Sequence, residues 1–440
     1  MKFKNLLYQY KLKWRYARYE EFIEDQNNIL KDTPENIQKI SIKRAVKIAQ
    51  YAFKNIPFYQ KKYKKYGVSN ANDITEVSFQ NLPVLTKQDV RESYDYFYES
   101  KNVNRLKSAA TGGSTGEPLK FRYDSSIPYI VNNQMILNWW GVNCGENAIV
   151  IRRSPLTGMR LLRNSIFWYP TKNFYLDAAL MTEKTMGEMV KKIKRINSCY
   201  ITGYVGAIYE FALYIQKNEI EVESIKAVWT TSAPLANFQR QIMEKIFNAK
   251  VYNQYGSCEN PWLASECSKQ NGMHIFSHIR YLEFVNDENK NVGASQIGNI
   301  LVTNTIDYCF PFIRYQTGDR SKLLSESCSC GLPFPLMSPV KGRETDCIVL
   351  PDKSIVSGDY LTTLFDEFPN AITAFQICQK KDMKIELLVV PNTKYANNLI
   401  EIEKVTQKLT CLIKNQILIS VICVPEIPHD KGKTRFIIHE

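Results

Sequence analysis

The sequence has no uninterrupted apolar stretch of about 18 residues, the length that a helix needs to span a bilayer. Its first residues, MKFKNLLYQYKLKWRYARYEEF, hold no apolar core followed by a small-residue cleavage site. With 44% hydrophobic and 23% charged residues, the composition also excludes a disordered chain, a collagen-like repeat and a small disulfide scaffold. We therefore expect a globular, cytoplasmic protein whose 440 residues form two or three domains.

RNA-binding signatures, zinc-finger spacings and basic-zipper heptads are also missing, so we expect no nucleic-acid partner. The formal net charge is nevertheless +13. Much of this excess lies among aromatic residues near the N-terminus, at Lys2, Lys4, Lys11, Lys13, Arg15 and Arg18 and again at Lys61, Lys62, Lys64 and Lys65. The pattern fits either a peripheral contact with an anionic membrane or a solvated helix face whose aromatic side chains pack on the domain.

The eleven cysteines are an odd number, and without a secretion signal they are better interpreted as reduced thiols or metal ligands than as disulfides. Cys267 and His274 in one segment, with Cys328 and Cys330 in another, offer three thiolates and one imidazole, the set of a tetrahedral structural zinc site. The alternative is a group of reduced cysteines on two loops. We expect His278 to be an ordinary polar residue.

Hydrophobic periodicity predicts a helix over residues 34–56, ended by Pro57. Further along, short apolar runs alternate with helical stretches between about residues 105 and 310, which predicts an α/β fold with buried strands and ligand-binding loops. The expected strands are NAIVIRR (147–153), SCYITGY (198–204), IKAVWTTS (225–232), KVYNQYG (250–256) and IGNILVTNT (297–305). Residues 344–440 contain an amphipathic helix, an apolar strand and a basic tail, and we predict a separate small α/β domain there.

The segment 108–118, SAATGGSTGEP, holds three glycines and four hydroxyl residues. Glycines allow backbone N–H groups to turn inward and hydroxyls donate to oxygen, so the segment suits phosphate. Its spacing is not that of a Walker loop, and the later segment 427–434 also lacks the first glycine of that motif. A plain Ser/Gly loop is the alternative.

Three further segments follow expected strands or the domain junction: YGSCE (255–259), YQTGD (315–319) and Gly342-Arg343. Glu259 would be a natural magnesium ligand beside phosphates, and Asp319 at a strand end could accept both hydroxyls of a ribose. In their order and spacing, TGGSTGEP, YGSCE, RYQTGD, KGR and the final PHDKGK resemble the motifs of the adenylate-forming superfamily. The segments AQYAFKNIPFY (49–59) and LPVLTK (82–87) resemble its phenylacetate–CoA ligase and CapK-like branch in particular.

This resemblance implies a large N-terminal adenylation domain of several subdomains over residues 1–343, with a helical segment over about 1–100, and a small mobile C-terminal α/β domain over 344–440. It implies an ATP- and Mg²⁺-dependent, AMP-forming ligase that converts a carboxylic acid to acyl-AMP, releases pyrophosphate and passes the acyl group to an acceptor. The implied catalytic residues are Lys433 and the magnesium ligand Glu259. The implied ATP/AMP-binding residues are Thr111, Gly112, Gly113, Ser114, Thr115, Gly116, Ser232, Ala233, Pro234, Tyr255, Gly256, Asp319 and Arg343.

The resemblance also places the acyl pocket near Trp139, Trp140, Tyr200, Tyr204 and Val205, although aromatic residues are as often core. The acceptor stays open among CoA, an amine and a sugar hydroxyl, because the tunnel segment is altered to LPDKSIVSG and TTSAPL (230–235) lacks a glutamate frequent in phenylacetate ligases. We favour a CapK-like enzyme, with a role in surface polysaccharide biosynthesis, over an aryl–CoA ligase. The alternative of another class is a non-catalytic nucleotide-binding or membrane-surface protein.

Overall fold

The computed structural model describes residues 2–340 except 100–103, 112–118, 154–155, 234 and 236, and residues 347–440 except 353, 358–360, 362–363, 365–367, 369–370, 394 and 428–436. The chain forms two compact units. The first comprises Met1–Ala109 and Phe121–Gly342, and the second comprises Ala110–Lys120 and Arg343–Glu440. None of the described helices is both long enough and apolar enough to traverse a bilayer.

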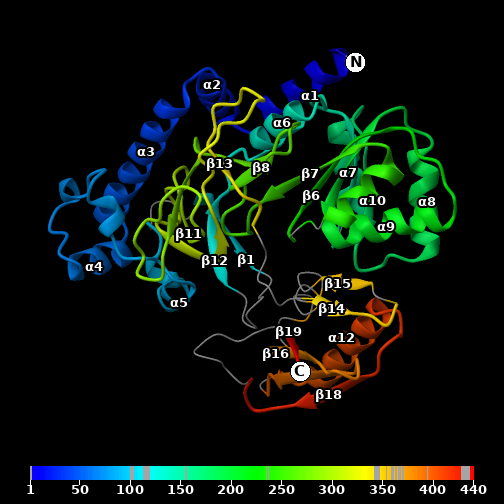
Figure 1. The fold of residues 1–440 in the computed structure, drawn as a ribbon. Helices are drawn as coiled ribbons and strands as arrows, with labels where there is room; N and C mark the ends of the chain where they lie inside the picture. Colours follow the sequence, from blue (N-terminus) through cyan, green and yellow to red (C-terminus); the bar gives the residue numbers. More distant parts are fainter. Residues whose placement is uncertain are drawn as a thin grey trace. The chain divides into compact units, whose positions relative to one another are not determined.

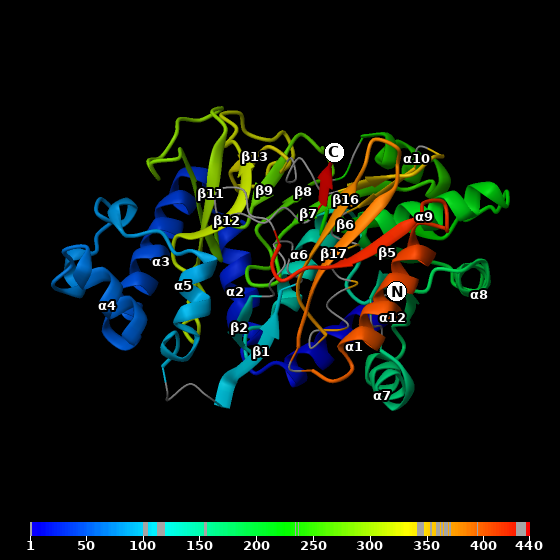
Figure 2. The same cartoon turned by 90° about the horizontal axis from the view of Figure 1, so that it is seen from below.

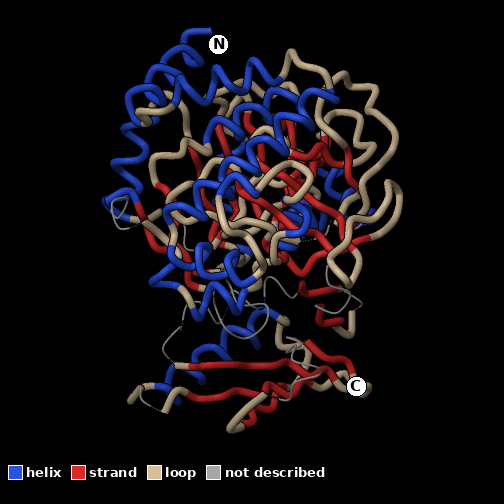
Figure 3. Tube along the Cα trace, turned by 90° about the vertical axis from the view of Figure 1, so that its left-hand side faces the viewer, coloured by secondary structure: helices blue, strands red, loops and turns tan. Residues whose placement is uncertain are grey.

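The first unit begins with helices, and the long α3 shows why the sequence forms them. Thr33 precedes α3 and accepts a hydrogen bond from the Asn36 N–H at 3.3 Å, and Pro34 occupies the first turn, where no N–H is needed. Figure 3 shows the chain beginning in helices, in blue, at the end marked N. The helices are α1 (Lys2–Arg15), α2 (Tyr19–Ile29), α3 (Pro34–Asn55), α4 (Pro57–Lys65) and α5 (Lys87–Glu92). The predicted helix over 34–56 is therefore confirmed, and the chain bends at Pro57.

An eight-stranded sheet forms the centre of the first unit, with strand order β13-β9-β8-β7-β6-β5-β3-β4 (Figure 1). Helices between its strands pack on it, α9 against β3, β5 and β6, and α10 against β7. The strands are β3 (Asn147–Arg152), β4 (Asn173–Asp177), β5 (Cys199–Tyr204), β6 (Ile225–Thr231), β7 (Lys250–Tyr255), β8 (Ala264–Glu266), β9 (Met273–Ile275) and β13 (Leu336–Met337). The helices are α6 (Ile130–Trp139), α7 (Gly158–Trp168), α8 (Glu183–Ile193), α9 (Val205–Lys217) and α10 (Asn237–Phe247).

Strand direction changes within this sheet at β7. The strands β4, β3, β5, β6 and β7 run parallel, whereas β7 with β8, β8 with β9 and β9 with β13 are antiparallel. The carboxyl ends of the parallel strands therefore share one edge, where ligands bind in open α/β sheets. Four of the five expected strands, in β3, β5, β6 and β7, are confirmed as members of this sheet.

The fifth expected strand lies in a different sheet. It becomes β11 (Gly298–Asn304), which pairs antiparallel with β10 (Arg280–Val285) on one side and β12 (Tyr315–Ser321) on the other. The N-terminal segment joins this sheet, because the Leu85 N–H donates to the Arg314 carbonyl at 3.0 Å and the Gln316 N–H donates to the Leu85 carbonyl at 2.9 Å. A separate two-stranded sheet joins β1 (Leu106–Ala110) to β2 (Lys120–Asp124).

The second unit contains a four-stranded sheet of order β18-β17-β16-β19 and one described helix, α12 (Asn398–Leu412) (Figure 2). Its strands are β16 (Ile372–Gln379), β17 (Ile385–Pro391), β18 (Ile419–Cys423) and β19 (Ile437–His439), with a small pair β14 (Cys347–Val349) and β15 (Ile355–Ser357). Val405 and Leu409 of α12 are buried against β16 and β17. The predicted C-terminal helix and strand are confirmed as α12 and β18, whereas β16 and β17 were not anticipated.

Candidate functional site

Several predicted ligand-binding residues lie at the carboxyl edge of the parallel strands. Tyr204 ends β5, Ser232 follows β6, and Tyr255 ends β7. Ser232 has φ of 74°, a left-handed conformation that is uncommon outside glycine. Gly256 follows Tyr255 where a Cβ atom would lie 2.9 Å from the Trp262 nitrogen, so only glycine fits. The chain thus turns sharply at the ends of both β6 and β7.

Two side-chain hydrogen bonds connect this edge with β12. The Tyr255 hydroxyl donates to Asp319 Oδ2 at 2.7 Å, and the Tyr315 hydroxyl donates to Glu259 Oε1 at 2.9 Å. Tyr315 begins β12 and Asp319 lies four residues further along, within a stretch where the pairing of β12 with β11 is irregular. We call Tyr255, Glu259, Tyr315 and Asp319 the polar link.

In the polar link, burial and a neighbouring carboxylate keep the Tyr255 hydroxyl protonated. Burial raises the pKa of Tyr255 far above the usual range, and the neighbouring Asp319 carboxylate raises it further. The phenol therefore stays a hydrogen-bond donor to Asp319 at every physiological pH.

Glu259 is 7% exposed, and its orientation is fixed by Tyr315 through one oxygen. Among the described residues, no donor reaches its second oxygen, Oε2. A buried carboxylate with one oxygen held and the other without a donor fits Mg²⁺, which prefers oxygen ligands.

The glycine loop is described only at its base. The Thr111 N–H donates to the Leu119 carbonyl at 3.0 Å, and Thr111 Oγ1 accepts from the Leu119 N–H at 3.0 Å. Ser232 is exposed and Ala233 half-buried. The remaining predicted nucleotide and catalytic residues lie outside the described residues: Gly112, Gly113, Ser114, Thr115, Gly116, Pro234, Arg343 and Lys433.

Three of the predicted pocket residues belong to an aromatic core. Trp140 is 7% exposed, its ring stacks on Tyr252 with centroids 4.7 Å apart, and its Nε1 donates to the Glu266 carbonyl at 2.8 Å. Trp139 and Tyr200 are half-buried and pack against the same cluster. Their packing accounts for these side chains as core, and a role in substrate binding stays a prediction.

The other two predicted pocket residues lie elsewhere. Tyr204 and Val205 stand where β5 passes into α9, at the carboxyl edge of the sheet. Burial raises the pKa of Tyr204, and the positive charge of Arg153 opposes that rise. Tyr204 thus ends a parallel strand at the same edge as Tyr255.

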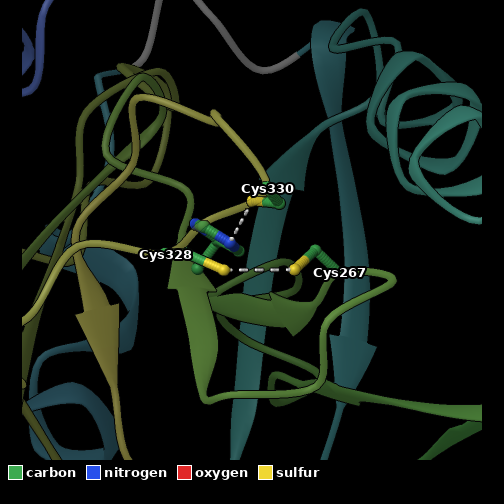
Figure 4. A group of neighbouring side chains, drawn as sticks. Cys267, Cys328 and Cys330 are labelled. Carbon is green, nitrogen blue, oxygen red and sulfur yellow. Dashed lines mark hydrogen bonds between the residues drawn. The ribbon is translucent and has the colours of Figure 1, made fainter.

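The four predicted zinc ligands come together. Cys267 follows β8, His274 lies in the middle of β9, and Cys328 and Cys330 lie on the connection from β12 to β13. Pairing of Leu336 with His274 brings this connection beside β9. Figure 4 shows the sulfurs of Cys267 and Cys328 facing each other, with Cys330 beside them. We call the four residues the Cys/His cluster.

The geometry of the Cys/His cluster suits a metal ion. Its ligand atoms all lie within 4.8 Å of one another, with Cys267 Sγ 3.6 Å from Cys328 Sγ and Cys330 Sγ 3.3 Å from His274 Nε2. In a tetrahedron with zinc–sulfur bonds of about 2.3 Å, neighbouring sulfurs are about 3.8 Å apart. His274 Nδ1 lies 3.1 Å from the Phe334 carbonyl, so Nε2 is the nitrogen turned towards a metal. The cluster can therefore hold a metal ion.

The neighbours of the Cys/His cluster have other roles. Glu266 accepts hydrogen bonds from Arg240 Nη2 and from the Asn253 N–H, both at 2.7 Å. His278 is buried, with Nε2 3.2 Å from Asn132 Oδ1, and it is not among the cluster residues. That His278 is an ordinary polar residue stays a prediction.

Sequence reasoning did not single out Tyr315 as a site residue. Its role depends on the register between β12 and the loop after β7, which no local pattern encodes. The available signal was the motif YQTGD itself, which holds Tyr315 four residues before Asp319.

Comparison with known proteins identifies relatives of the chain. A family model for the CapK C-terminal domain matches residues 348–440. Protein CapK of Staphylococcus aureus is 27% identical over 367 residues, 80% of this chain and 78% of that protein. A phenylacetate–coenzyme A ligase of Thermus thermophilus is 20% identical over 372 residues, 79% of this chain and 79% of that protein.

Solved structures agree on the fold. A 2-hydroxyisobutyryl-CoA ligase in complex with 2-HIB-AMP and CoA superposes with a TM-score of 0.62, covering 93% of this chain and 91% of that chain at 17% identity. The same ligase in its postadenylation state gives a TM-score of 0.59 over 91% of this chain and 89% of that chain at 16% identity. The chain is therefore a relative of CapK and of the phenylacetate–CoA ligases, with the fold of the adenylate-forming ligases.

Proposed function

We propose that the protein activates a carboxylic acid with ATP, forms acyl-AMP and pyrophosphate, and then transfers the acyl group to an acceptor. The observation that carries this proposal is the polar link, which holds Glu259 and Asp319 at the carboxyl edge of the parallel sheet. The kinship with CapK and phenylacetate–CoA ligases, and a structural neighbour that binds an acyl-AMP, support it.

We assign the nucleotide to the carboxyl edge. The hydroxyls of the ribose would be accepted by Asp319, and the adenine would lie at Tyr255 and Gly256 on one side and at Ser232, Ala233 and Pro234 on the other. The segment 111–116 would hold the β- and γ-phosphates through backbone N–H groups and hydroxyls. Arg343 would contact ribose or phosphate.

A carboxylate and a triphosphate repel each other, so charge must be neutralised before the carboxylate oxygen can approach the α-phosphorus in line. Glu259 would hold Mg²⁺, which when bound neutralises phosphate charge. Lys433 would supply positive charge to the pentavalent transition state. We further propose that residues 344–440 act as a mobile lid domain that delivers Lys433.

The metal of the Cys/His cluster would be zinc, because three sulfurs and one nitrogen are the ligands of a structural zinc site. Such a site would have no open position for substrate. It would fix the connection from β12 to β13 against β8 and β9.

Two acceptors have support. A structural neighbour that binds CoA favours the CoA thiol. We base the second, an amine or hydroxyl acceptor in surface polysaccharide biosynthesis, on the CapK-like motifs of the sequence and on its altered segment LPDKSIVSG. Product analysis with CoA and with sugar or amine acceptors separates them, since a thioester and an amide or ester have different masses.

The first experiment is ATP–pyrophosphate exchange across a panel of small carboxylic acids, with Lys433→Ala. Exchange should depend on particular acids and fall by about 10²-fold or more in the variant, because a charge used mainly in the transition state is lost. Lys404→Ala, at an exposed position of α12, is the matched control and should keep full activity. Absence of exchange and of ATP binding would instead favour a non-catalytic binding protein.

A further inference from the structure

Helix α1 exposes a row of large apolar side chains. Phe3, Leu6, Tyr10 and Trp14 are 75%, 65%, 68% and 76% exposed. Their spacing of three, four and four residues places them on one face of the helix. On another face, Leu12 is fully buried in a cluster that anchors the helix to the domain.

Helix α7 lies beside α1 and extends this apolar row (Figure 2). The two helices are joined by Trp14 and Phe167, whose ring centroids are 5.9 Å apart, and by Lys11, whose Nζ donates to the Tyr169 carbonyl. On α7 and just after it, the exposed apolar side chains are Met159, Leu162, Ile166 and Tyr169, at 65%, 53%, 66% and 67%. We call these eight exposed residues of the two helices the α1–α7 surface. Exposed apolar patches of this kind mark interaction sites.

The charge around the α1–α7 surface is mainly positive. Residues 1–19 contain six lysines and arginines and residues 147–176 contain five, and neither segment contains an aspartate or glutamate. Arg160 and Arg163 are exposed on α7. Acids flank both segments: Glu20 and Glu21 on α2 pair with Lys13 at 2.5 Å and with Arg18 at 2.7 Å, and Glu146 and Asp177 stand at either end of the second segment.

A basic hollow of about 440 Å³ adjoins α1. Lys4, Lys172 and Arg195 line it, with Lys4 Nζ held by Asn147 Oδ1 at 2.9 Å. The acid in its lining, Glu146, is paired with Lys226 at 2.7 Å. Lysine and arginine heads of this kind bind phosphate oxygens.

We propose that the α1–α7 surface docks on a bilayer that contains anionic phospholipid. The exposed apolar side chains enter the boundary between headgroups and acyl chains, while Arg160, Arg163 and the basic hollow bind lipid phosphates. Helix α1 lies along the membrane plane and does not cross it. The sequence pattern pointed only to the N-terminus, and the structure adds α7 and the hollow.

Charge argues against other occupants of this surface. A second copy packed on it by twofold symmetry would place one basic patch against an identical one, which repels. Nucleic acid binds to basic residues with aromatic stacking platforms. The surface has exposed aromatic rings, but the other half of its apolar side chains, Leu6, Met159, Leu162 and Ile166, are aliphatic or thioether groups. These add nothing to base stacking and suit acyl chains.

Vesicle sedimentation of the full chain tests the proposal. Vesicles of equal parts phosphatidylglycerol and phosphatidylcholine should bind the protein at least about 10-fold more tightly than pure phosphatidylcholine vesicles, and less tightly as salt is raised. Leu6→Ser with Trp14→Ser, and separately Arg160→Glu with Arg163→Glu, should each weaken binding by about 10-fold or more.

Matched controls come from exposed positions that are not part of this surface or of the hollow. Leu399→Ser with Ile400→Ser on α12 controls for lost apolar area, and Lys61→Glu with Lys64→Glu on α4 controls for reversed charge. All variants should keep the far-ultraviolet circular dichroism of the unmodified chain.

Three results would overturn the proposal: no binding to anionic vesicles, equal binding by all variants, or a concentration-dependent dimer that the Trp14 variant abolishes. The last would assign the surface to a second copy of the chain. ATP–pyrophosphate exchange in solution should be unchanged in the surface variants, so failure of docking stays distinguishable from failure of the adenylation proposal.

Discussion

Two of the junctions between the eight-stranded and three-stranded sheets differ in chemistry. In the polar link, Tyr255 and Glu259 from one sheet meet Asp319 and Tyr315 from the other through hydroxyl–carboxylate hydrogen bonds. In the Cys/His cluster, sulfur and imidazole atoms from β8 and β9 meet the chain that follows β12. A hydrogen bond contributes a net of about 1 kcal/mol and can be exchanged for one to a ligand, whereas a four-ligand metal site is closed. Activity and rigidity should therefore be separable by mutation.

Breaking the Cys/His cluster should have the largest effect. Cys267→Ser with Cys330→Ser should remove about one equivalent of zinc per chain and lower the free energy of unfolding by about 4 kcal/mol or more, as loss of a structural metal does. Metal analysis and urea denaturation measure the two effects. Cys411→Ser, at an exposed thiol, is the control. Purified protein without zinc, or a double variant of unchanged stability, would contradict the prediction.

Breaking the polar link should instead affect activity. Asp319→Ala should lower the rate of ATP–pyrophosphate exchange by about 10²-fold, because the ribose and the Tyr255 hydroxyl both lose their acceptor. Its melting temperature should fall much less than that of the cluster variant. Asp382→Ala, at an exposed acid, should leave exchange unchanged. Equal losses of stability in the Asp319 and cluster variants would show that the two junctions do not differ as we propose.

The free energy of unfolding should depend on pH through His278, which lies in the covalent connection between the sheets, residues 276–279. Burial, and then the positive charges of Arg44 and Arg280, lower the pKa of His278 from 6.5 to about 3. Below about pH 6.5, His278 binds a proton in the unfolded chain but not in the folded chain. The neutral His278 therefore contributes its full stability above that pH, and this contribution is lost as the pH falls towards 3.

As the pH falls from about 6.5 to 5, proton uptake by His278 in the unfolded chain should therefore lower the free energy of unfolding by about 2 kcal/mol. His278→Gln should lose correspondingly less than the unmodified chain over the same interval. Urea denaturation at the two pH values measures the difference. Parallel losses in both proteins would mean that His278 takes up its proton in the folded state.

Tyr315→Phe should have the smallest effect of these changes, and it tests the polar link most specifically because it removes only the hydroxyl that donates to Glu259. The variant keeps the ring that packs at 5.0 Å from Phe312 but frees Glu259 Oε1, so exchange should fall by about 10-fold and its Mg²⁺ dependence should shift to higher concentration. Tyr66→Phe, at a 62% exposed tyrosine, is the matched control. An unchanged Mg²⁺ dependence would remove Glu259 from the proposed metal site.

Much of the fold was predictable because buried parallel strands are nearly continuous apolar runs. The sequence predicted the strands β3, β5, β6 and β7 for this reason. It did not reveal β4 and β16, in which polar residues interrupt the apolar pattern, as in NFYLD and ITAFQICQ. The apolar run of β17, IELLVVP, was available in the sequence but was not singled out. It also did not show that β11 leaves the parallel sheet, because strand direction depends on connections far along the chain.

The candidate site was predictable to the extent that its residues lie in compact motifs. Cys267 and His274 are seven residues apart and Cys328 and Cys330 two, and the structure brings the pairs together. The contact between Tyr315 and Glu259 was not predictable, since it joins residues separated by 56 positions. The exposed row on α7 was not anticipated either, because an amphipathic pattern does not tell which face the domain covers.

The reversal of strand direction at β7 has a kinetic consequence. The hairpin of β7 and β8 closes through contacts local in sequence, such as Tyr255 with Ala264, and local contacts form fast. The hydrogen bonds that join Tyr255 to Asp319 and Tyr315 to Glu259 close loops of 64 and 56 residues. These hydrogen bonds form late in folding, because closing a long loop costs entropy. A nascent or partly folded chain would thus contain the segment YGSCE (255–259) before it could bind a nucleotide. The ability to bind would be acquired late in folding.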